Sequence, residues 1–404
     1  MNDVPVLKTP FRSVMFAVVL VILGVFASIY GVRNDPQRTW PHLLLNGFYV
    51  VSLGVSAAFF LATQRATGAR WSAALRRVPE AFMMVLPVAA ILMTLLFVER
   101  QNLFSWSQPG AFDHLTAPAG KVFYLRTPWV LGRIIVVFSL WTIFALIFRR
   151  TSLAQDTRPE LSLALHERLT RSAVLFVPVF AITFTLAAYD WLISLDPSWF
   201  STMFAIYVFI GVFVQGIAAV TLAAVLLKRH TPLESVITDR HLHDLGKMLL
   251  AFTTFWAYIW VCQYLLIWYG NIPEEVTHYV PRTNGPWLYL FALNLFANWI
   301  IPFVVLLSAR TKRNPKVLIT ICALLLLGHW LDLYLLVMPN FSPAGQDFGP
   351  KELAIAAGYL ALAYLLFIRS LARAPLAPLH DPILAYEAHE HANALSYGSY
   401  GVRQ

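Results

Sequence analysis

The sequence predicts an all-α membrane protein with ten transmembrane helices. Hydrophobic residues make up 58% of the 404 residues, whereas charged residues make up only 13%. The apolar residues gather in runs long enough to cross the ~30 Å hydrocarbon core of a bilayer. Soluble domains are less apolar and more charged than this. The net charge of +9 therefore points to membrane topology rather than to nucleic-acid binding.

The ten runs lie, in chain order, at roughly 13–30, 43–63, 79–98, 128–148, 172–193, 199–227, 245–269, 287–307, 317–338 and 352–368. Of the 30 lysines and arginines, 21 fall in the termini and the loops on one side, and seven fall on the other. The positive-inside rule then predicts that both termini are cytoplasmic. The first run follows Lys8 and Arg12 and lacks a small-residue cleavage site, so we expect it to stay as an uncleaved anchor.

An internal repeat predicts two four-helix bundles, formed by spans two to five and six to nine, with two peripheral helices. Thr127-Pro128-Trp129 opens the fourth span as Gly285-Pro286-Trp287 opens the eighth, and Asp190 and Asp332 then occupy equivalent places. Such repeats are common in membrane transport folds. The expected units are an anchor and loop (1–41), the first bundle (42–196), the second bundle (197–338), a tenth helix (339–372) and a cytoplasmic tail (373–404) that contacts a partner or nothing.

Polar residues of the first bundle predict a site near the periplasmic face. His42, Asn46 and Tyr49 share one face of the second span because they follow one another at i, i+4 and i+7. Arg133 and Asp190 reach a similar depth from the fourth and fifth spans. Hydrogen-bonding groups, a proton acceptor and aromatic neighbours are what a quinone site needs. The alternative is a purely structural Arg133–Asp190 ion pair.

The second bundle carries a different polar set, which we interpret as part of a proton path. His329 and Asp332 lie one turn apart on the ninth span, and Asn294 and Asn298 lie one turn apart on the eighth. Ionisable residues inside a bilayer are functional candidates by default. A hydrogen-bonded His–Asp pair that only satisfies itself inside the bundle is the alternative.

Charged residues also stand at the predicted cytoplasmic starts of two spans. Glu80 begins the third span, and Asp244 with Lys247 begins the seventh. These residues either cap helix N-termini, where the helix dipole favours acids, or form a proton entry. The stripe that begins with Trp256 on the seventh span is expected to serve packing.

The sequence does not favour a redox centre on this chain. Cys262 and Cys322 both lie within spans, and no C-x-x-C pair is present to ligate an iron–sulfur cluster or attach a c-type haem. An intramembrane haem would need two histidines on facing helices, and only His42 and His329 lie near the membrane interior. We also expect no bound metal.

Three segments carry a resemblance to a known family. They are YLRTPWVLGR (124–133), YDWLISLDPSWFSTMFAIYVF (189–209) and DLGKMLLAFTTFWAYIWVCQYLLIWYGNIPEE (244–275). These segments resemble the ActF type of NrfD-like membrane subunit found in bacterial alternative complex III, which is related to the membrane subunit of polysulfide reductase. The likeness covers nearly the whole span region.

The resemblance implies a multi-pass subunit of the bacterial inner membrane within a quinol:electron acceptor oxidoreductase. Haem c and iron–sulfur proteins and a paralogous NrfD-like subunit would be its partners, and menaquinone or ubiquinone its ligand. The chain alone would then not be an enzyme. A proton-coupled secondary transporter and a structural scaffold without quinone are the alternatives.

Overall fold

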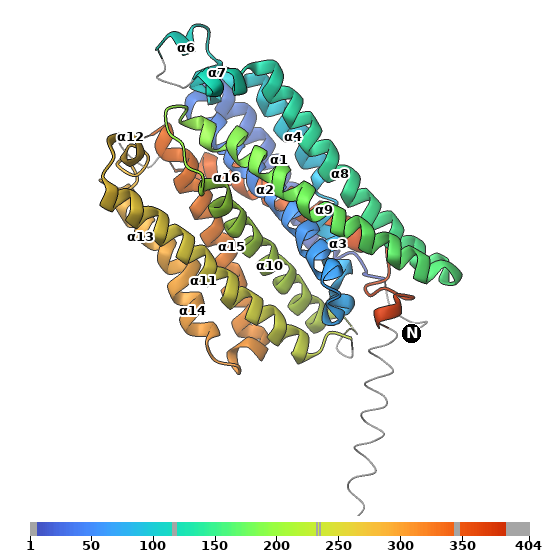
Figure 1. The fold of residues 1–404 in the computed structure, drawn as a ribbon. Coiled ribbons are helices and arrows are strands. Elements are labelled where there is room, and N and C mark those ends of the chain that lie inside the picture. Colours follow the sequence, from blue (N-terminus) through green and yellow to red (C-terminus); the bar gives the residue numbers. More distant parts are fainter. Residues whose placement is uncertain (1–5, 115–118, 232, 234–235, 343–347, 385–404) are drawn as a thin grey trace, which may run out of the picture.

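Ten helical segments are long and apolar enough to cross a membrane in the part of the chain that the structure describes, in agreement with the prediction. The structure is a computed structural model that describes residues 6–114, 119–231, 233, 236–342 and 348–384 (Figure 1). The segments are Phe11–Asn34 (α1), Pro36–Ala66 (α2), Arg77–Leu103 (α3 to α5), Thr127–Thr157 (α8), Pro159–Leu195 (with α9), Phe204–His230 (α10), Asp239–Gly270 (α11), Trp287–Leu306 (α13 and α14), Pro315–Asn340 (with α15) and Pro350–Leu371 (α16).

Several of these segments contain more than one helix, and short helices lie in the connections. The bounds are Arg77–Met83 (α3), Leu86–Leu96 (α4), Arg100–Leu103 (α5), Ala111–His114 (α6), Ala119–Tyr124 (α7), Ser162–Trp191 (α9), Pro273–Val276 (α12), Trp287–Leu295 (α13), Ile301–Leu306 (α14) and Pro315–Val337 (α15). Helix starts follow local chemistry. At α15, the Asn314 side chain accepts a hydrogen bond from the Lys316 amide, and Pro315 fills the first helical position, where no amide donor is needed.

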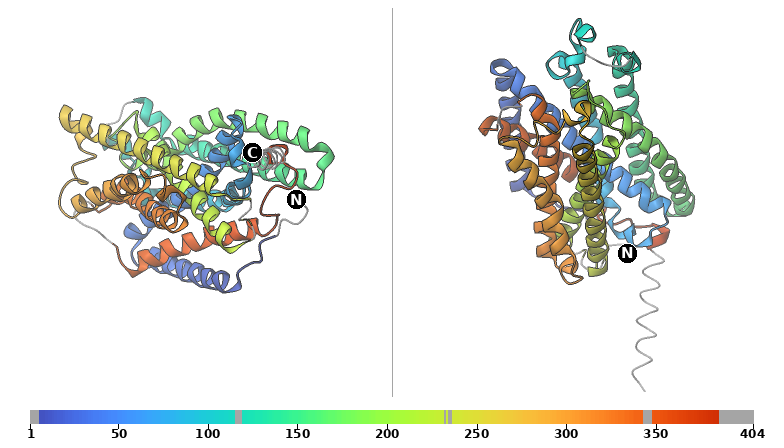
Figure 2. Two further views of the ribbon diagram at one scale, coloured as in Figure 1. Left: turned by 90° about the horizontal axis from the view of Figure 1, so that it is seen from below. Right: turned by 60° about the vertical axis from the view of Figure 1, so that its left-hand side comes forward.

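Helices α2 and α10 form the centre of the molecule. They contact each other, and 94% and 89% of their most apolar windows are buried. Helices α3, α4, α8 and α9 contact α2, while α11 and α15 contact α10. Helix α1 packs beside α16 at one edge (Figure 2), and only 17% of its apolar window is buried, so its remaining surface suits lipid contact.

Two helices extend well beyond the predicted spans. Helix α9 begins at Ser162 rather than near residue 172, and α11 begins at Asp239 rather than near residue 245. The predicted spans leave these turns out because hydropathy marks where a helix enters lipid, and the added turns are polar. Thr238 caps the start of α11 and forms a capping box with His241.

The first part of the predicted tail packs against the helices. Val6 forms a β-bridge with Pro375, so the two ends of the described chain meet at the same end of the molecule (Figure 1). Leu376, Ala377 and Leu384 are buried. We call residues 372–384 the strap. The rest of the predicted tail, 385–404, lies outside the described residues.

The contact between α1 and α16 depends on two glycines. A Cβ atom added to Gly24 would lie 2.7 Å from the Cα atom of Gly358, too close for a side chain. We predict that Gly24→Ala costs about 1–3 kcal/mol by pushing α1 away from α16. The thermal unfolding midpoint measures this loss. Gly132→Ala is the control, because a Cβ there meets no atom within 4 Å; an equal loss in both variants would contradict the prediction.

Candidate functional site

The carboxyl group of Asp332 on α15 accepts three hydrogen bonds in the second half of the chain. Its Oδ1 atom accepts hydrogen bonds from the Tyr207 hydroxyl and from Asn294 Nδ2 (2.7 Å). Its Oδ2 atom accepts a longer one from Trp256 Nε1 (3.3 Å). These donors come from α10, α13 and α11, and Asp332 is only 2% exposed. Donors from three neighbouring helices thus hold a buried acid inside a span.

His329 lies one helical turn before Asp332 and extends the polar set towards α2. Its Nδ1 atom is 3.9 Å from Asp332 Oδ2, and its ring centroid is 6.2 Å from that of Tyr49. Gly211 makes room for this imidazole, since a Cβ there would come within 2.9 Å of the ring. The Nε2 atom of His329 is buried without a hydrogen-bond partner among the described residues.

Asn294 and Asn298 belong to the same network. Asn298 Nδ2 donates to Asn294 Oδ1 over 2.7 Å, and Asn294 in turn donates to Asp332. Asn298 lies in a π-helical turn, Phe296–Ile300, four residues before Pro302. Proline lacks the amide that would bond to the Asn298 carbonyl, which favours a local departure from α-helix. The four predicted residues of the second half are therefore close together.

A small cavity adjoins Asp332 and extends to the connection between α11 and α13. Its volume is about 20 Å³. A single water molecule needs roughly 10–15 Å³ measured in this way, so the cavity has room for one. The polar residues of its wall include Tyr207, Gln263, His278, Arg282, Asn294 and Asp332.

The outer part of the cavity wall holds a fixed positive charge. Arg282 is 2% exposed and donates to the carbonyls of Leu335 and Leu336, both over 2.9 Å. Burial lowers the pKa of Arg282 to about 10, so it stays charged at neutral pH. Burial and the nearby Arg282 lower the pKa of His278 well below its ordinary value, so this imidazole stays neutral.

In the first half of the chain, Arg133 and Asp190 form a bidentate ion pair. Arg133 Nε lies 2.9 Å from Asp190 Oδ2, and Nη2 lies 2.7 Å from Oδ1. Nη2 also donates to the Tyr124 carbonyl, and the guanidinium lies 3.7 Å above the Tyr124 ring. Burial and the neighbouring Asp190 raise the pKa of Tyr124, so its phenol stays protonated.

The other three first-half residues face a different neighbour. The ring of His42 lies 5.9 Å from that of Tyr334, Asn46 Oδ1 accepts from Trp330 Nε1 (2.9 Å), and the Tyr49 hydroxyl donates to the Leu326 carbonyl (2.9 Å). All these contacts are with α15. The structure thus brings Arg133 to Asp190, and brings His42, Asn46 and Tyr49 to α15 instead.

The three predicted cytoplasmic residues have separate surroundings. Glu80 is fully buried and accepts hydrogen bonds from Arg77 (2.8 Å) and Arg149 (3.3 Å). Asp244 pairs with Lys247 over 2.6 Å, where the Lys247 side chain is 56% exposed. Asp244 lies five residues inside α11, so it does not cap that helix.

No protein-family model matches the chain, and no curated protein matches it. Among the described residues, no three histidine, cysteine or acidic side chains gather where they could hold a metal ion.

Sequence reasoning missed three members of the Asp332 surroundings, namely Tyr207, Trp256 and Arg282. Trp256 was expected only to pack, yet its indole donates to the carboxyl group. Trp256 lies in one helical stripe with the polar residue Gln263, and this polar neighbour could have indicated a role beyond packing. Arg282 could have been found because it is the one lysine or arginine between the seventh and eighth predicted spans.

Proposed function

We propose that this chain is the integral membrane subunit of a respiratory quinol:electron acceptor oxidoreductase of the alternative complex III type, and that its second half carries protons. The proposal depends most on Asp332, a buried carboxyl group beside a cavity of water size. An acid inside a span is costly and is therefore a functional candidate. Haem c and iron–sulfur proteins and a paralogous NrfD-like subunit would be the partners.

In this proposal the Asp332 carboxyl group binds and releases the proton. Tyr207 and Asn294 hold its Oδ1 atom in place. Oδ2 accepts only the longer hydrogen bond from Trp256, and we assign proton exchange to this oxygen. A water molecule in the cavity exchanges protons between Asp332 and the connection that holds His278. On the other side, the 3.9 Å separation from His329 Nδ1 exceeds a hydrogen bond, so transfer there requires rotation of a side chain or a bridging water.

The proposed quinone contacts are the five predicted residues of the first half. A bound ubiquinol or menaquinol supplies two electrons and two protons. The five residues divide into two sets, and we assign the ring to the Arg133–Asp190 side, where the Arg133 side chain is 17% exposed. Nε and Nη2 of Arg133 bind Asp190, and we assign the remaining nitrogen, Nη1, to a ligand oxygen. His42, Asn46 and Tyr49 contact α15 instead, so they lie outside the position assigned to the ring.

Removing the ion pair tests the quinone assignment. We predict that Arg133→Leu and Asp190→Asn each lower quinol oxidation by the assembled complex at least tenfold, because each removes a charge-assisted hydrogen bond worth about 1.5–3 kcal/mol. Steady-state quinol turnover measures this effect. Arg171→Leu is the control, because Arg171 is exposed on the same helix as Asp190. Unchanged turnover in both test variants would favour a scaffold without quinone.

Copurification tests the assignment to a respiratory complex. A tagged chain extracted from native membranes in mild detergent should bring with it haem c, visible in the absorption spectrum, and iron–sulfur proteins. The buried acid and small cavity would equally suit a proton-coupled transporter. Purification as a single component with substrate uptake in liposomes would favour the transporter and reject the respiratory assignment.

A further inference from the structure

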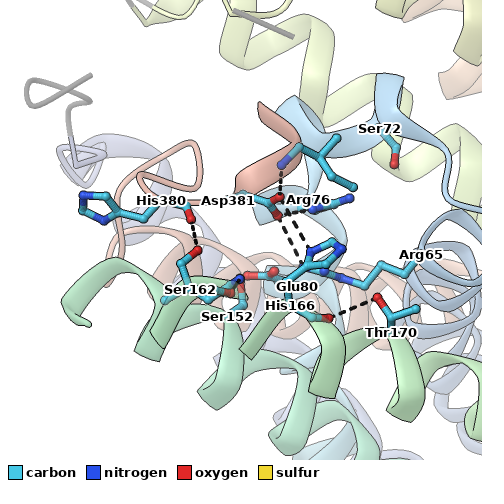
Figure 3. Close-up of polar contacts among 12 residues, drawn as sticks. Arg65, Ser72, Arg76, Glu80, Ser152, Ser162, His166, Thr170, His380 and Asp381 are labelled. Atoms are coloured by element: carbon cyan, nitrogen blue, oxygen red, sulfur yellow. Dashed lines mark hydrogen bonds and ion pairs between the residues drawn. The ribbon is translucent and has the colours of Figure 1, made fainter. Parts of the chain in front are cut away.

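A cluster of buried charged residues lies where the strap crosses the ends of α2, α3, α8 and α9 (Figure 3). The cluster is separate from the Asp332 network and from the Arg133–Asp190 pair. Its members are Arg65, Arg76, Arg77, Arg149, Glu80, Asp156 and Asp381. Four guanidinium groups thus share three carboxylates.

Three of the four guanidinium groups are well paired. Arg77 bonds to both Glu80 and Asp156, and Arg149 bonds to Glu80 and to the carbonyl of Ser370. Arg76 bonds to Asp381 of the strap. Each carboxylate therefore already has a close basic partner before the fourth guanidinium is considered.

The fourth, Arg65, lacks such a partner. Its side chain is 0% exposed, and its nearest acid atom is Asp381 Oδ2 at 3.8 Å. Its Nε, Nη1 and Nη2 atoms have no hydrogen-bond partner among the described residues, and neither does Nε of Arg76. A buried charge without hydrogen bonds is strongly destabilising. An additional anion would remove both the excess charge and the unsatisfied donors.

We propose that Arg65, Arg76 and His166 bind one phosphate group beside Asp381. The forked guanidinium of Arg65 matches two phosphate oxygens, and the Nε of Arg76 adds a third donor. His166 Nδ1 lies 4.0 Å from Asp381 Oδ1, and its side chain is 21% exposed, so it marks the accessible edge of the site (Figure 3).

The phosphate could belong to an anionic lipid headgroup or be free in solution. Arg65 lies in the last turn of α2, where the apolar part of this span ends. Basic pockets between transmembrane helices at this level bind anionic headgroups. The site does not depend on the proposed respiratory function, because Arg65, Arg76 and His166 have no role in that proposal.

Thermal unfolding of the full chain in detergent, with sodium phosphate against sodium chloride at equal ionic strength, tests the site. We expect phosphate to raise the midpoint by about 3 °C with saturation. Arg65→Gln should abolish this shift, and His166→Gln, at the partly exposed edge, should weaken the apparent affinity about tenfold. Arg171→Gln, with a side chain 82% exposed, should retain the full shift.

The proposal is overturned if chloride gives the same rise, or if His166→Gln and a folded Arg65→Gln both respond like the unchanged chain. Because Arg65→Gln could fail to fold, His166→Gln provides the decisive comparison in that case. Nanodiscs distinguish the two sources. If phosphatidylglycerol discs remove the response to added phosphate and phosphatidylcholine discs retain it, a lipid headgroup occupies the site; a response retained in both identifies free phosphate.

Discussion

Replacing Asp332 with asparagine should lower proton-coupled turnover about a hundredfold or more, because the side chain can no longer bind and release a proton. Asparagine is close to aspartate in shape, so the contacts of Tyr207 and Asn294 with Oδ1 can persist. The measurement is proton release in proteoliposomes that hold the assembled complex, together with quinol oxidation. A variant that still releases protons at the original rate would remove Asp332 from the path.

A loss of folding must be separated from a loss of proton transfer. In Asp332→Asn, the amide Nδ2 would face the indole donor of Trp256, which sets two donors against each other at a cost of about 1–3 kcal/mol. The double variant Asp332→Asn with Trp256→Phe removes that conflict. We expect it to recover thermal stability relative to Asp332→Asn but to remain inactive. Recovered activity would show that Asp332 acts only in folding.

The sequence was a good guide to the transmembrane helices and a poor guide to their ends. A bilayer requires about 20 apolar residues in each helix, so composition alone locates each crossing. Outside the lipid a helix does not need apolar residues. Hydropathy therefore does not predict the polar first turns of α9 and α11. The strap escaped prediction for the same reason, since its contacts come from one buried acid, Asp381, a few apolar residues and backbone hydrogen bonds, none of which forms a long apolar run.

Site residues were predictable within a helix but not between helices. The i, i+3 spacing of His329 and Asp332 fixes a common face, and both side chains are buried as expected. Sequence spacing does not fix how a helix is rotated about its own axis. Asn46 therefore contacts α15 through Trp330 rather than joining Arg133.

The second large effect concerns the strap. Asp381→Asn should destabilise the protein by about 3–5 kcal/mol, because it leaves Arg76 and Arg65 buried without their shared carboxylate. We expect the thermal midpoint to fall and hydrogen exchange at the strap amides to speed up together. In the unchanged chain the Leu379 amide donates to Asp156 and the Ile383 amide donates to Asp381. Asp239→Asn is the control, because its ion pair with Lys228 is at the surface.

The same ion pairs set a pH dependence for the strap. Burial alone would raise the pKa of Asp381, but Arg76 and Arg65 outweigh it and hold the pKa below the ordinary value of 3.8. A lowered folded-state pKa gives stability that is fully present above pH 3.8 and is lost as pH falls through the folded value. Loss of protection from hydrogen exchange at the strap amides of the unchanged chain should therefore occur only in strong acid. The Asp381→Asn variant should lack that transition.

Phosphate should partly reverse the effect of Asp381→Asn. In the unchanged chain the Asp381 carboxylate shares Arg65 and Arg76 with the phosphate group and repels it. The neutral asparagine of the variant does not repel it. The midpoint of Asp381→Asn should hence rise more with added phosphate than that of the unchanged chain, and strap exchange should slow again. A smaller rise in the variant would mean that Asp381 organises the two arginines for the anion rather than competing with it.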